Sequence, residues 1–421
     1  MPQTSWSSSS GAVSPPHYVV GLDIGSETCM VGALAPDKRV VLTPFVITND
    51  GPGFERLHQK VAQLGCSSQD IVVGLEATGR YWEQVYYFLQ QRGYRLVLLH
   101  PAQTHHFAQR RGLRAKTDKL DALTIARVLL SEDARPAYVP NELTATYREL
   151  VRLHSNLSDE AARYKNEIQD LLVVLFPEFK QVFKDPTRKT ALAVLRAYPS
   201  AQAIAAAGEA PIAAILQATA PRNFGPATAA RLVALAQRSS ASPVAVAARG
   251  RSLAILADQL AHTQANIEEL EREIDALVQQ DGGTTGLQSC PDFGPKTVAV
   301  LRAELGEVER FQRSEHVVAY AGLDVTVRES GKWKGQRKLS KRGSGVLRRS
   351  LYMAAFGCLR HPHAAFRAYY QALAARGVKG KRALMAVMRK MLVVAYHLLR
   401  SGERYDPTKV WAGARPAEAG G

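Results

Sequence analysis

The sequence predicts an α/β domain followed by a mostly helical remainder, and three observations support this division. Short apolar runs alternate with segments of helical spacing as far as Leu130. Two long stretches between residues 141 and 286 then repeat apolar side chains at helical spacing. The rest is helical apart from one polar, basic interruption. A length of 421 residues is enough for about two to four domains.

The first segment, residues 18–140, predicts a sheet of about five strands with helices between the later ones. The expected strands are Tyr18–Leu22, Met30–Leu34, Val40–Ile47, Ile71–Leu75 and Tyr94–Leu99. The expected helices are Phe54–Leu64, Tyr81–Arg92 and Thr117–Leu130. Because no helix separates the first three strands, we expect them to pair as successive hairpins. Residues 1–17 are rich in Ser and Pro and are expected to form a disordered tail.

The middle segment, residues 141–286, predicts an antiparallel coiled-coil arm. Glu142–Phe176 and Leu253–Val278 both carry apolar residues at helical spacing with charges between them. Residues 185–250, which lie between these stretches, are rich in Ala and are punctuated by Pro and Gly. We therefore expect a small helical insert within the arm.

The last segment, residues 287–406, predicts a mostly helical C-terminal domain, followed by a Gly/Ala-rich tail at 407–421. The expected helices are Val298–Glu304, Glu315–Ala321, Val346–Leu359, Ala364–Arg376 and Arg382–Leu399. The polar, basic stretch Asp324–Ser344 interrupts them.

The net charge of +16 lies almost entirely in this last segment. Residues 287–421 carry 25 basic and 10 acidic side chains, whereas residues 1–140 carry 14 and 12. From Ser330 to Gly402 there are 17 Lys and Arg but no Asp or Glu. Because no acidic side chains of this segment balance its basic ones, we expect it to bind a polyanion.

Composition also excludes several classes of protein. With 46% apolar residues the chain can form real cores, so global disorder is excluded. No run of 18 or more apolar residues occurs, which predicts no membrane span. The four cysteines are far apart and form no CxxC pair, which favours a reducing, cytosolic setting.

Four carboxylates stand where strands and a helix begin or end. Asp23 and Glu76 each follow an apolar strand next to a glycine-containing turn, and Asp118 and Asp121 share one face of a helix start. Burying such groups alone is costly, so a shared partner is expected. Hard oxygen ligands suit Mg²⁺, and two such ions could stabilise both oxygens of a phosphodiester exchange.

Two alternatives remain for these residues. Asp23 can be a plain turn residue and Asp118 a helix N-cap. The sequence Gly21-Leu-Asp-Ile-Gly-Ser also resembles the first phosphate loop of actin-like kinases, although no second nucleotide loop is present.

Ser330 is the candidate nucleophile, and it stands at the start of the acid-free stretch. A positive field lowers the cost of forming an alkoxide and stabilises a phosphorane-like transition state. The alternative is an ordinary loop serine. The surrounding basic residues are expected to bind nucleic acid, and the alternative is a solvated basic face: Lys332, Lys334, Arg337, Lys338, Lys341, Arg342, Arg348 and Arg349.

The segment Cys290-Pro-Asp-Phe-Gly-Pro-Lys-Thr297 looks like the turn of a helix-hairpin-helix motif. Backbone N–H groups of such a turn can hold a phosphate. Asp292 would repel phosphate, so a helix-capping turn is an equally open interpretation.

Together these motifs resemble one family, the insertion sequence 110 transposases, including the insertion sequence 1111 group. The matching segments follow the family's order: Gly21-Leu-Asp-Ile-Gly, Leu75-Glu-Ala-Thr-Gly-Arg-Tyr, Lys116-Thr-Asp-Lys-Leu-Asp-Ala, Ala321-Gly-Leu, Arg328-Glu-Ser-Gly and Val346-Leu-Arg-Arg-Ser-Leu-Tyr. The resemblance implies a RuvC-like (RNase H-type) DEDD domain, a coiled coil and a C-terminal transposase domain. The insert at 185–250 departs from the compact members of the family.

The resemblance also implies a function. Asp23, Glu76, Asp118 and Asp121 match the family's metal-binding tetrad, and Ser330 matches its covalent nucleophile. We therefore expect an Mg²⁺-dependent DNA recombinase, guided by a bridge RNA, that acts in the bacterial cytoplasm at the nucleoid. The family is understood to form homo-oligomers, up to tetramers, in which one protomer's tetrad faces another's serine. The rival interpretations are a metal-only RuvC-like nuclease and a non-catalytic RNA-binding protein.

Overall fold

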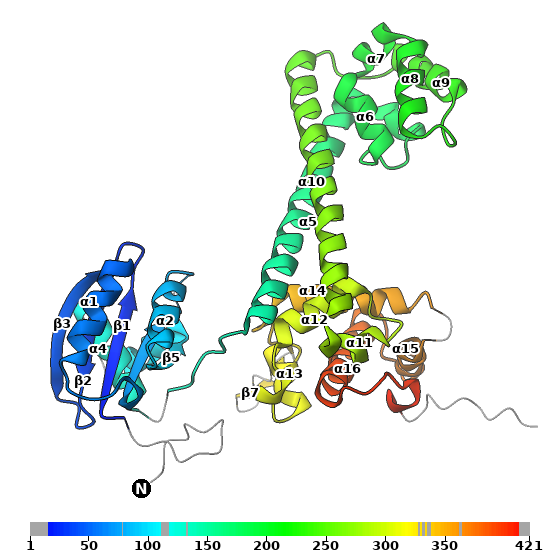
Figure 1. The fold of residues 1–421 in the computed structure, drawn as a ribbon. Coiled ribbons are helices and arrows are strands. Elements are labelled where there is room, and N and C mark those ends of the chain that lie inside the picture. Colours follow the sequence, from blue (N-terminus) through cyan, green and yellow to red (C-terminus); the bar gives the residue numbers. More distant parts are fainter. Residues whose placement is uncertain are drawn as a thin grey trace, which may run out of the picture. The chain divides into compact units, whose positions relative to one another are not determined.

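The computed structural model describes residues 16–77, 79–110, 118–131, 134–326, 329–330, 333–334, 338–361 and 364–411. The chain divides into two compact units, Met1–Val139 and Pro140–Gly421. Figure 1 shows the elements of both units. No helix among the described residues is long and apolar enough to cross a membrane.

The N-terminal unit is built on one five-stranded sheet, which confirms the predicted mixed α/β domain. The strand order is β3-β2-β1-β4-β5, with β1, β2 and β3 antiparallel and with β4 and β5 parallel to β1. The three hairpin-connected strands are therefore as predicted. The strands are β1 (Tyr18–Ile24), β2 (Thr28–Leu34), β3 (Val40–Thr48), β4 (Ile71–Glu76) and β5 (Arg95–Leu99).

Helices cover both faces of this sheet. α1 (Gly51–Ala62) and α2 (Trp82–Gln91) bury apolar residues against one face, and α3 (Pro101–Arg110) and α4 (Asp118–Leu129) cover the other. α3 was not predicted from the sequence, because no helix was expected between the strand Tyr94–Leu99 and the helix Thr117–Leu130. Pro101 is instead the first residue of α3, a position where its missing N–H costs nothing.

A row of glycines lets α4 lie unusually close to the sheet. Gly32, Gly21 and Gly74 pair across β2, β1 and β4. A Cβ atom on Gly21 would lie 2.0 Å from the Ala122 carbonyl oxygen and 2.8 Å from the Ala126 nitrogen. Small residues therefore meet on both sides of this contact, and the helix backbone rests directly on the strand backbone.

The second unit contains two long antiparallel helices, α5 (Glu142–Leu175) and α10 (Val246–Gln280), which form the arm. The Tyr147 hydroxyl lies 3.3 Å from the Leu277 carbonyl oxygen, and His154 Nε2 lies 2.9 Å from Glu271 Oε1. From the first pair to the second, the residue number increases along α5 and decreases along α10, as antiparallel packing requires.

The two ends of the arm belong to different hydrophobic cores. At one end Ile168, Leu172 and Leu260 pack with the helices of residues 185–250, which form a compact tip domain. At the other end Tyr147, Ile274 and Val278 pack into the C-terminal helices. The helices of the tip are α6 (Lys189–Ala197), α7 (Ala201–Ala207), α8 (Glu209–Thr219) and α9 (Pro226–Gln237), and the short η2 (Pro177–Gln181) precedes them after α5.

The C-terminal helices form the base of the arm. They are α11 (Thr285–Gln288), α12 (Pro295–Leu305), α13 (Ser314–Tyr320), α14 (Gly345–Cys358), α15 (Ala365–Ala375) and α16 (Lys381–Ser401), with short 3₁₀ turns at Gly282–Thr284, Val308–Arg310 and Pro407–Lys409. The mostly helical C-terminal region is thus confirmed. Four two-residue strands, β6 to β9, interrupt it between α13 and α14: Val325–Thr326, Glu329–Ser330, Trp333–Lys334 and Lys338–Leu339.

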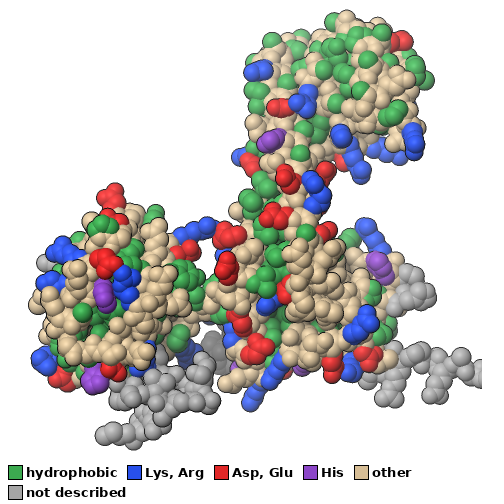
Figure 2. Space-filling model, in the orientation of Figure 1, with side chains coloured by type: hydrophobic (Ala, Val, Ile, Leu, Met, Phe, Trp, Pro, Cys, Tyr) green, Lys and Arg blue, Asp and Glu red, His purple; other side chains and the backbone are tan. Residues whose placement is uncertain are grey.

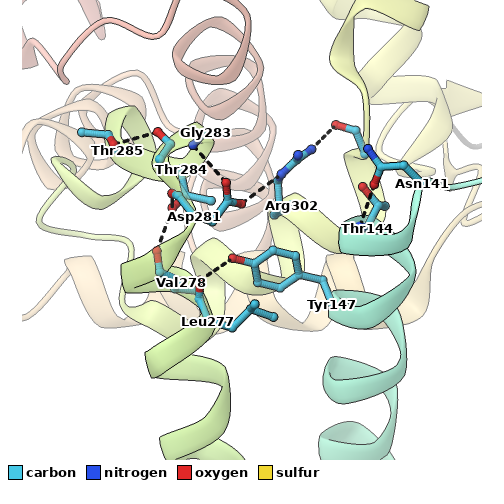
Figure 3. A network of polar contacts seen from close by, with 12 residues as sticks. Asn141, Thr144, Tyr147, Leu277, Val278, Asp281, Gly283, Thr284, Thr285 and Arg302 are labelled. Carbon is cyan, nitrogen blue, oxygen red and sulfur yellow. Dashed lines mark hydrogen bonds and ion pairs between the residues drawn. The ribbon is translucent and has the colours of Figure 1, made fainter.

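A buried ion pair joins the arm to its base (Figure 3). Arg302 Nε on α12 lies 3.2 Å from Asp281 Oδ2, directly after α10, and the two side chains are 16% and 7% exposed. Asp281 Oδ1 also accepts a hydrogen bond from the Gly283 nitrogen, and Arg302 Nη1 donates to the Gly306 carbonyl. Because both charges are hydrogen-bonded on several sides, the pair fixes the direction in which α10 leaves the base.

The glycine row gives a direct stability prediction. The substitution Gly21→Ala should destabilise the N-terminal unit by about 1–3 kcal/mol or more, because the new Cβ would overlap the backbone of α4. Thermal unfolding and limited proteolysis of the full chain would measure the loss. Gly51→Ala is the matched control, since a Cβ there meets nothing within 4 Å. Equal stability of the two variants would contradict the close approach.

Candidate active site

Two predicted carboxylates lie on the same edge of the sheet. β1 pairs with β4 in parallel with Leu22 opposite Leu75, so Asp23 and Glu76 follow at adjacent positions. Side chains alternate along a strand, and both residues therefore point to the face that carries Gly21 and Gly74. This is the face that α4 covers. Asp23 and Glu76 are both half-buried.

The helix on the glycine row begins at the other two predicted carboxylates. Asp118 is the first residue of α4, and Asp121 is half-buried one turn later, directly before the Ala122 contact with Gly21. The side chain of Asp118 lies outside the described residues. Among the side chains that are described, no three His, Cys, Asp or Glu gather as a metal site. The donors are nevertheless all hard carboxylate oxygens, a set that suits a divalent cation such as Mg²⁺.

Two further residues lie near these carboxylates: Thr104, which contacts Glu76, and Cys29, which pairs with Ile24 and packs on the opposite face of the sheet. The buried Thr104 of α3 places its hydroxyl 2.5 Å from Glu76 Oε2, where it can donate a hydrogen bond. Burial, with a contribution from the charge of Asp23, raises the pKa of the Cys29 thiol to about 12. Cys29 is therefore a neutral thiol at physiological pH. Thr104 was missed because α3 was missed.

Ser330 lies at the end of β7, in a small hairpin between α13 and α14. β7 pairs with β8, with Ser330 opposite Trp333, and β6 pairs with β9. The side chains of these strands up to Lys338 lie outside the described residues.

The base of this hairpin is closely held. The Lys341 nitrogen donates to the Gly322 carbonyl at 3.1 Å, and the Ser340 nitrogen donates to the Asp324 carbonyl at 3.0 Å. A Cβ on Gly343 would lie 2.1 Å from the Tyr320 carbonyl oxygen, so two backbone segments touch there. The hairpin that carries Ser330 consequently projects from a fixed base.

The predicted basic residues have different surroundings. Arg348 Nη1 donates to the carbonyls of Ala321 and Gly343, at 3.1 and 2.8 Å, and so ties α14 to the hairpin base. Arg349 Nη1 lies 2.7 Å from Asp159 Oδ1 on the arm. Lys341 and Arg342 are exposed at the base. Lys332 and Arg337 lie outside the described residues, as do the side chains of Lys334 and Lys338.

The turn at residues 290–297, which leads into α12, contacts the arm. Lys296 Nζ lies 3.3 Å from Glu271 Oε1, and the same carboxylate contacts the buried His154. Asp292 lines a pocket of about 470 Å³ together with Lys296 and His361. Burial raises the pKa of Asp292, and His361 opposes part of this shift. These contacts favour the structural interpretation of the turn over phosphate binding.

Comparison with known families gives two matches at opposite ends of the chain. A transposase family model of the DEDD type, named for IS110, matches residues 20–177. A second model, described as Transposase IS116/IS110/IS902 family, matches residues 285–371. The first match spans the carboxylates at the sheet edge and the second spans the Ser330 hairpin.

Individual relatives cover most of the chain. A 43.6 kDa protein of insertion element IS110 from Streptomyces coelicolor is 30% identical over 300 residues, which are 69% of this chain and 72% of the relative. The pilin gene-inverting protein of Moraxella bovis is 23% identical over 92% of this chain and 97% of its own length. A 42 kDa protein of IS900 from Mycobacterium paratuberculosis is 26% identical over 76% of this chain and 81% of its own length.

The environment of Asp292 predicts a pH dependence of stability. A carboxyl whose pKa is higher in the folded state contributes stability at low pH that is lost as pH rises through the folded pKa. Asp292→Asn should therefore raise the melting temperature at pH 7 by a few degrees, with little gain at pH 4. Differential scanning fluorimetry at both pH values would measure this. Asp170→Asn, on the exposed arm surface, is the control and should show no such difference. A gain of the same size at both pH values would contradict the burial of a charge at Asp292.

Proposed function

Because the chain belongs to the IS116/IS110/IS902 family of transposases, whose members are DNA recombinases, we propose that it exchanges DNA strands through a covalent serine–DNA link under RNA guidance. The proposal is supported by the elements that carry the four acids, which are neighbours in the fold: β1, β4 and the helix that covers them. Asp23, Glu76 and the start of α4 with Asp118 and Asp121 belong to these three separate elements. A purely structural helix start would not require acidic residues on both neighbouring strands.

The sheet supports the finer assignment of a RuvC-like (RNase H-type) domain. Its first three strands are antiparallel, the next two are parallel to the first, and Asp23 and Glu76 lie at the C-terminal ends of β1 and β4. Divalent cations bound by the four carboxylates, Mg²⁺ and two per site in our proposal, would stabilise the attacking and leaving oxygens of a phosphodiester. Thr104 positions Glu76 by its hydrogen bond.

Ser330 supplies the nucleophile in this proposal. Its hydroxyl oxygen attacks the phosphorus and loses its proton, and the bond from phosphorus to one sugar oxygen breaks. That sugar oxygen takes up a proton as it leaves. The phosphoserine link keeps the energy of the broken bond, so the reverse attack by another strand's hydroxyl rejoins DNA without ATP. The acid-free sequence after Ser330 keeps competing carboxylates away from the phosphate.

We propose the remaining partners from the family resemblance. The substrates are double-stranded donor and target DNA, and a non-coding bridge RNA selects them. The active form is a homo-oligomer in which the carboxylates of one protomer and Ser330 of another form one site. Such an enzyme works in the bacterial cytoplasm at the nucleoid.

Loss of the serine tests the mechanism. Ser330→Ala should abolish strand exchange between donor and target plasmids in the presence of Mg²⁺ and the copurified RNA, and EDTA should abolish exchange by the wild type. Ribonuclease treatment before the assay should also stop exchange.

Normal exchange by Ser330→Ala would refute the serine role, and exchange in EDTA would refute the metal role. Cleavage by Ser330→Ala at the wild-type rate would favour a metal-only nuclease.

Thr104 gives a finer test of the carboxylate site. Thr104→Val keeps the shape but removes the donor to Glu76, so the Mg²⁺ concentration for half-maximal exchange should rise about 10-fold. Thr104→Ser retains the hydroxyl and should stay near the wild type. DNA binding in EDTA should be equal in all three proteins. An unchanged Mg²⁺ dependence in Thr104→Val would show that the hydrogen bond does not position Glu76.

A further inference from the structure

The tip domain has a charge balance opposite to that of the arm that carries it. Residues 185–250 contain 7 Lys and Arg against 2 Asp and Glu, a net charge of +5. The arm segments 141–184 and 251–286 together contain 8 against 14, a net charge of −6. Figure 2 shows acidic side chains along the arm, and Lys and Arg gathered at one margin of the tip. The tip is therefore a separate basic body.

Three arginines of the tip form an exposed group without acidic partners. Arg231 lies on an exposed face of α9 with Ala227 and Ala234, and the exposed Arg238 follows as the C-cap residue of α9. Arg222 lies in the turn before α9. Within the described residues 134–326, none of the three arginines takes part in an ion pair, in contrast to Arg188 and Arg196, which pair with Asp185 and Asp258. Uncompensated arginines on a helix face predict an anionic partner.

The turn before α9 repeats the sequence of the turn before α12. Phe224-Gly-Pro-Ala-Thr228 corresponds to Phe293-Gly-Pro-Lys-Thr297, and in both the Gly precedes a helix whose first residue is Pro. The turn at the base has Asp292 beside it and its Lys296 is held by Glu271. The turn at the tip has Arg222 and Asn223 instead, both exposed. Of these two turns, only the one before α9 has a basic side chain, Arg222, that no described carboxylate pairs with.

The chemistry of this face favours a nucleic acid over a protein partner. None of the exposed large hydrophobic side chains of the described residues lies on α8 or α9, so an apolar contact surface is missing. Arg231 and Arg238 are about 10 Å apart along the helix axis, a span that covers several phosphates of a duplex. Because the family acts on DNA, we expect the anionic partner of this surface to be duplex DNA.

We propose that the α9 face of the tip domain, with Arg222, Arg231 and Arg238, is a second binding surface for double-stranded DNA that does not read sequence. The 34 residues of α5 span about 50 Å, which is more than one helical turn of DNA. The arm therefore extends the contacts to duplex outside the segment bound at the base. This surface adds affinity and salt dependence, and it leaves the choice of target to other parts of the complex.

The test compares two triple variants of the full chain. Arg222→Gln/Arg231→Gln/Arg238→Gln removes the unpaired group. Arg163→Gln/Arg188→Gln/Arg196→Gln changes net charge equally but removes arginines that pair with acids. Fluorescence anisotropy with a 40-base-pair duplex of random sequence, in EDTA, would give affinities from 50 to 200 mM salt. Over this range the wild type should lose about 40-fold more affinity than the first variant, because log K falls ~0.9 per phosphate contact. The second variant should follow the wild type.

Three results would overturn the proposal. The first is an unchanged salt dependence in the first variant with normal circular dichroism and melting temperature. The second is an equal loss in both variants, which would reflect net charge alone. The third is a loss of binding to single-stranded RNA of the same length without a loss for duplex DNA. Because the readout is binding without metal, failure of the serine mechanism would leave the experiment unaffected.

Discussion

The contact between α4 and the glycine row is the constraint on which the candidate active site depends. The Ala122 carbonyl oxygen lies only 2.0 Å from the position that a Cβ of Gly21 would take, so neither the strand nor the helix can shift without losing the contact. This close approach determines where the N-terminus of α4 meets the sheet edge. Asp121 is one residue before the contact, and Asp23 is two residues after Gly21 on β1. The positions of the acids therefore follow from the packing of small residues.

The second unit uses its positive charge in two ways. Arg348 and Arg349 are engaged by backbone carbonyls and by Asp159, and they stabilise the base of the Ser330 hairpin and its contact with the arm. Lys341 and Arg342 stay exposed beside that base. A hairpin that is fixed at its base, with exposed Lys341 and Arg342 beside it, is suited to approach a phosphate backbone. The acid-free sequence is thus part scaffold and, in our proposal, part binding surface.

Local sequence was sufficient to predict the strands and most helices, because apolar periodicity reports burial directly. It was not sufficient for α3, whose polar sequence carries only Thr104 and Phe107 to the core. The glycine row could not be recognised either, since Gly21, Gly32 and Gly74 become neighbours only through the strand register. The ion pair of Lys296 with Glu271 joins residues 25 apart and depends equally on tertiary packing. Asp23 and Glu76 could be selected as candidates because acids at strand ends stand out from apolar runs, and Asp118 and Asp121 because they share one face of a helix start.

In the proposed mechanism the sheet-edge carboxylates and Ser330 act in the same step. Mass spectrometry of protein denatured during the reaction tests this most directly, by locating the peptide that carries a covalently linked nucleotide. We expect the nucleotide on Ser330 in the wild type, and no adduct in Asp121→Asn, which keeps Ser330 intact. A nucleotide on another residue, or an undiminished Ser330 adduct in Asp121→Asn, would contradict the claim.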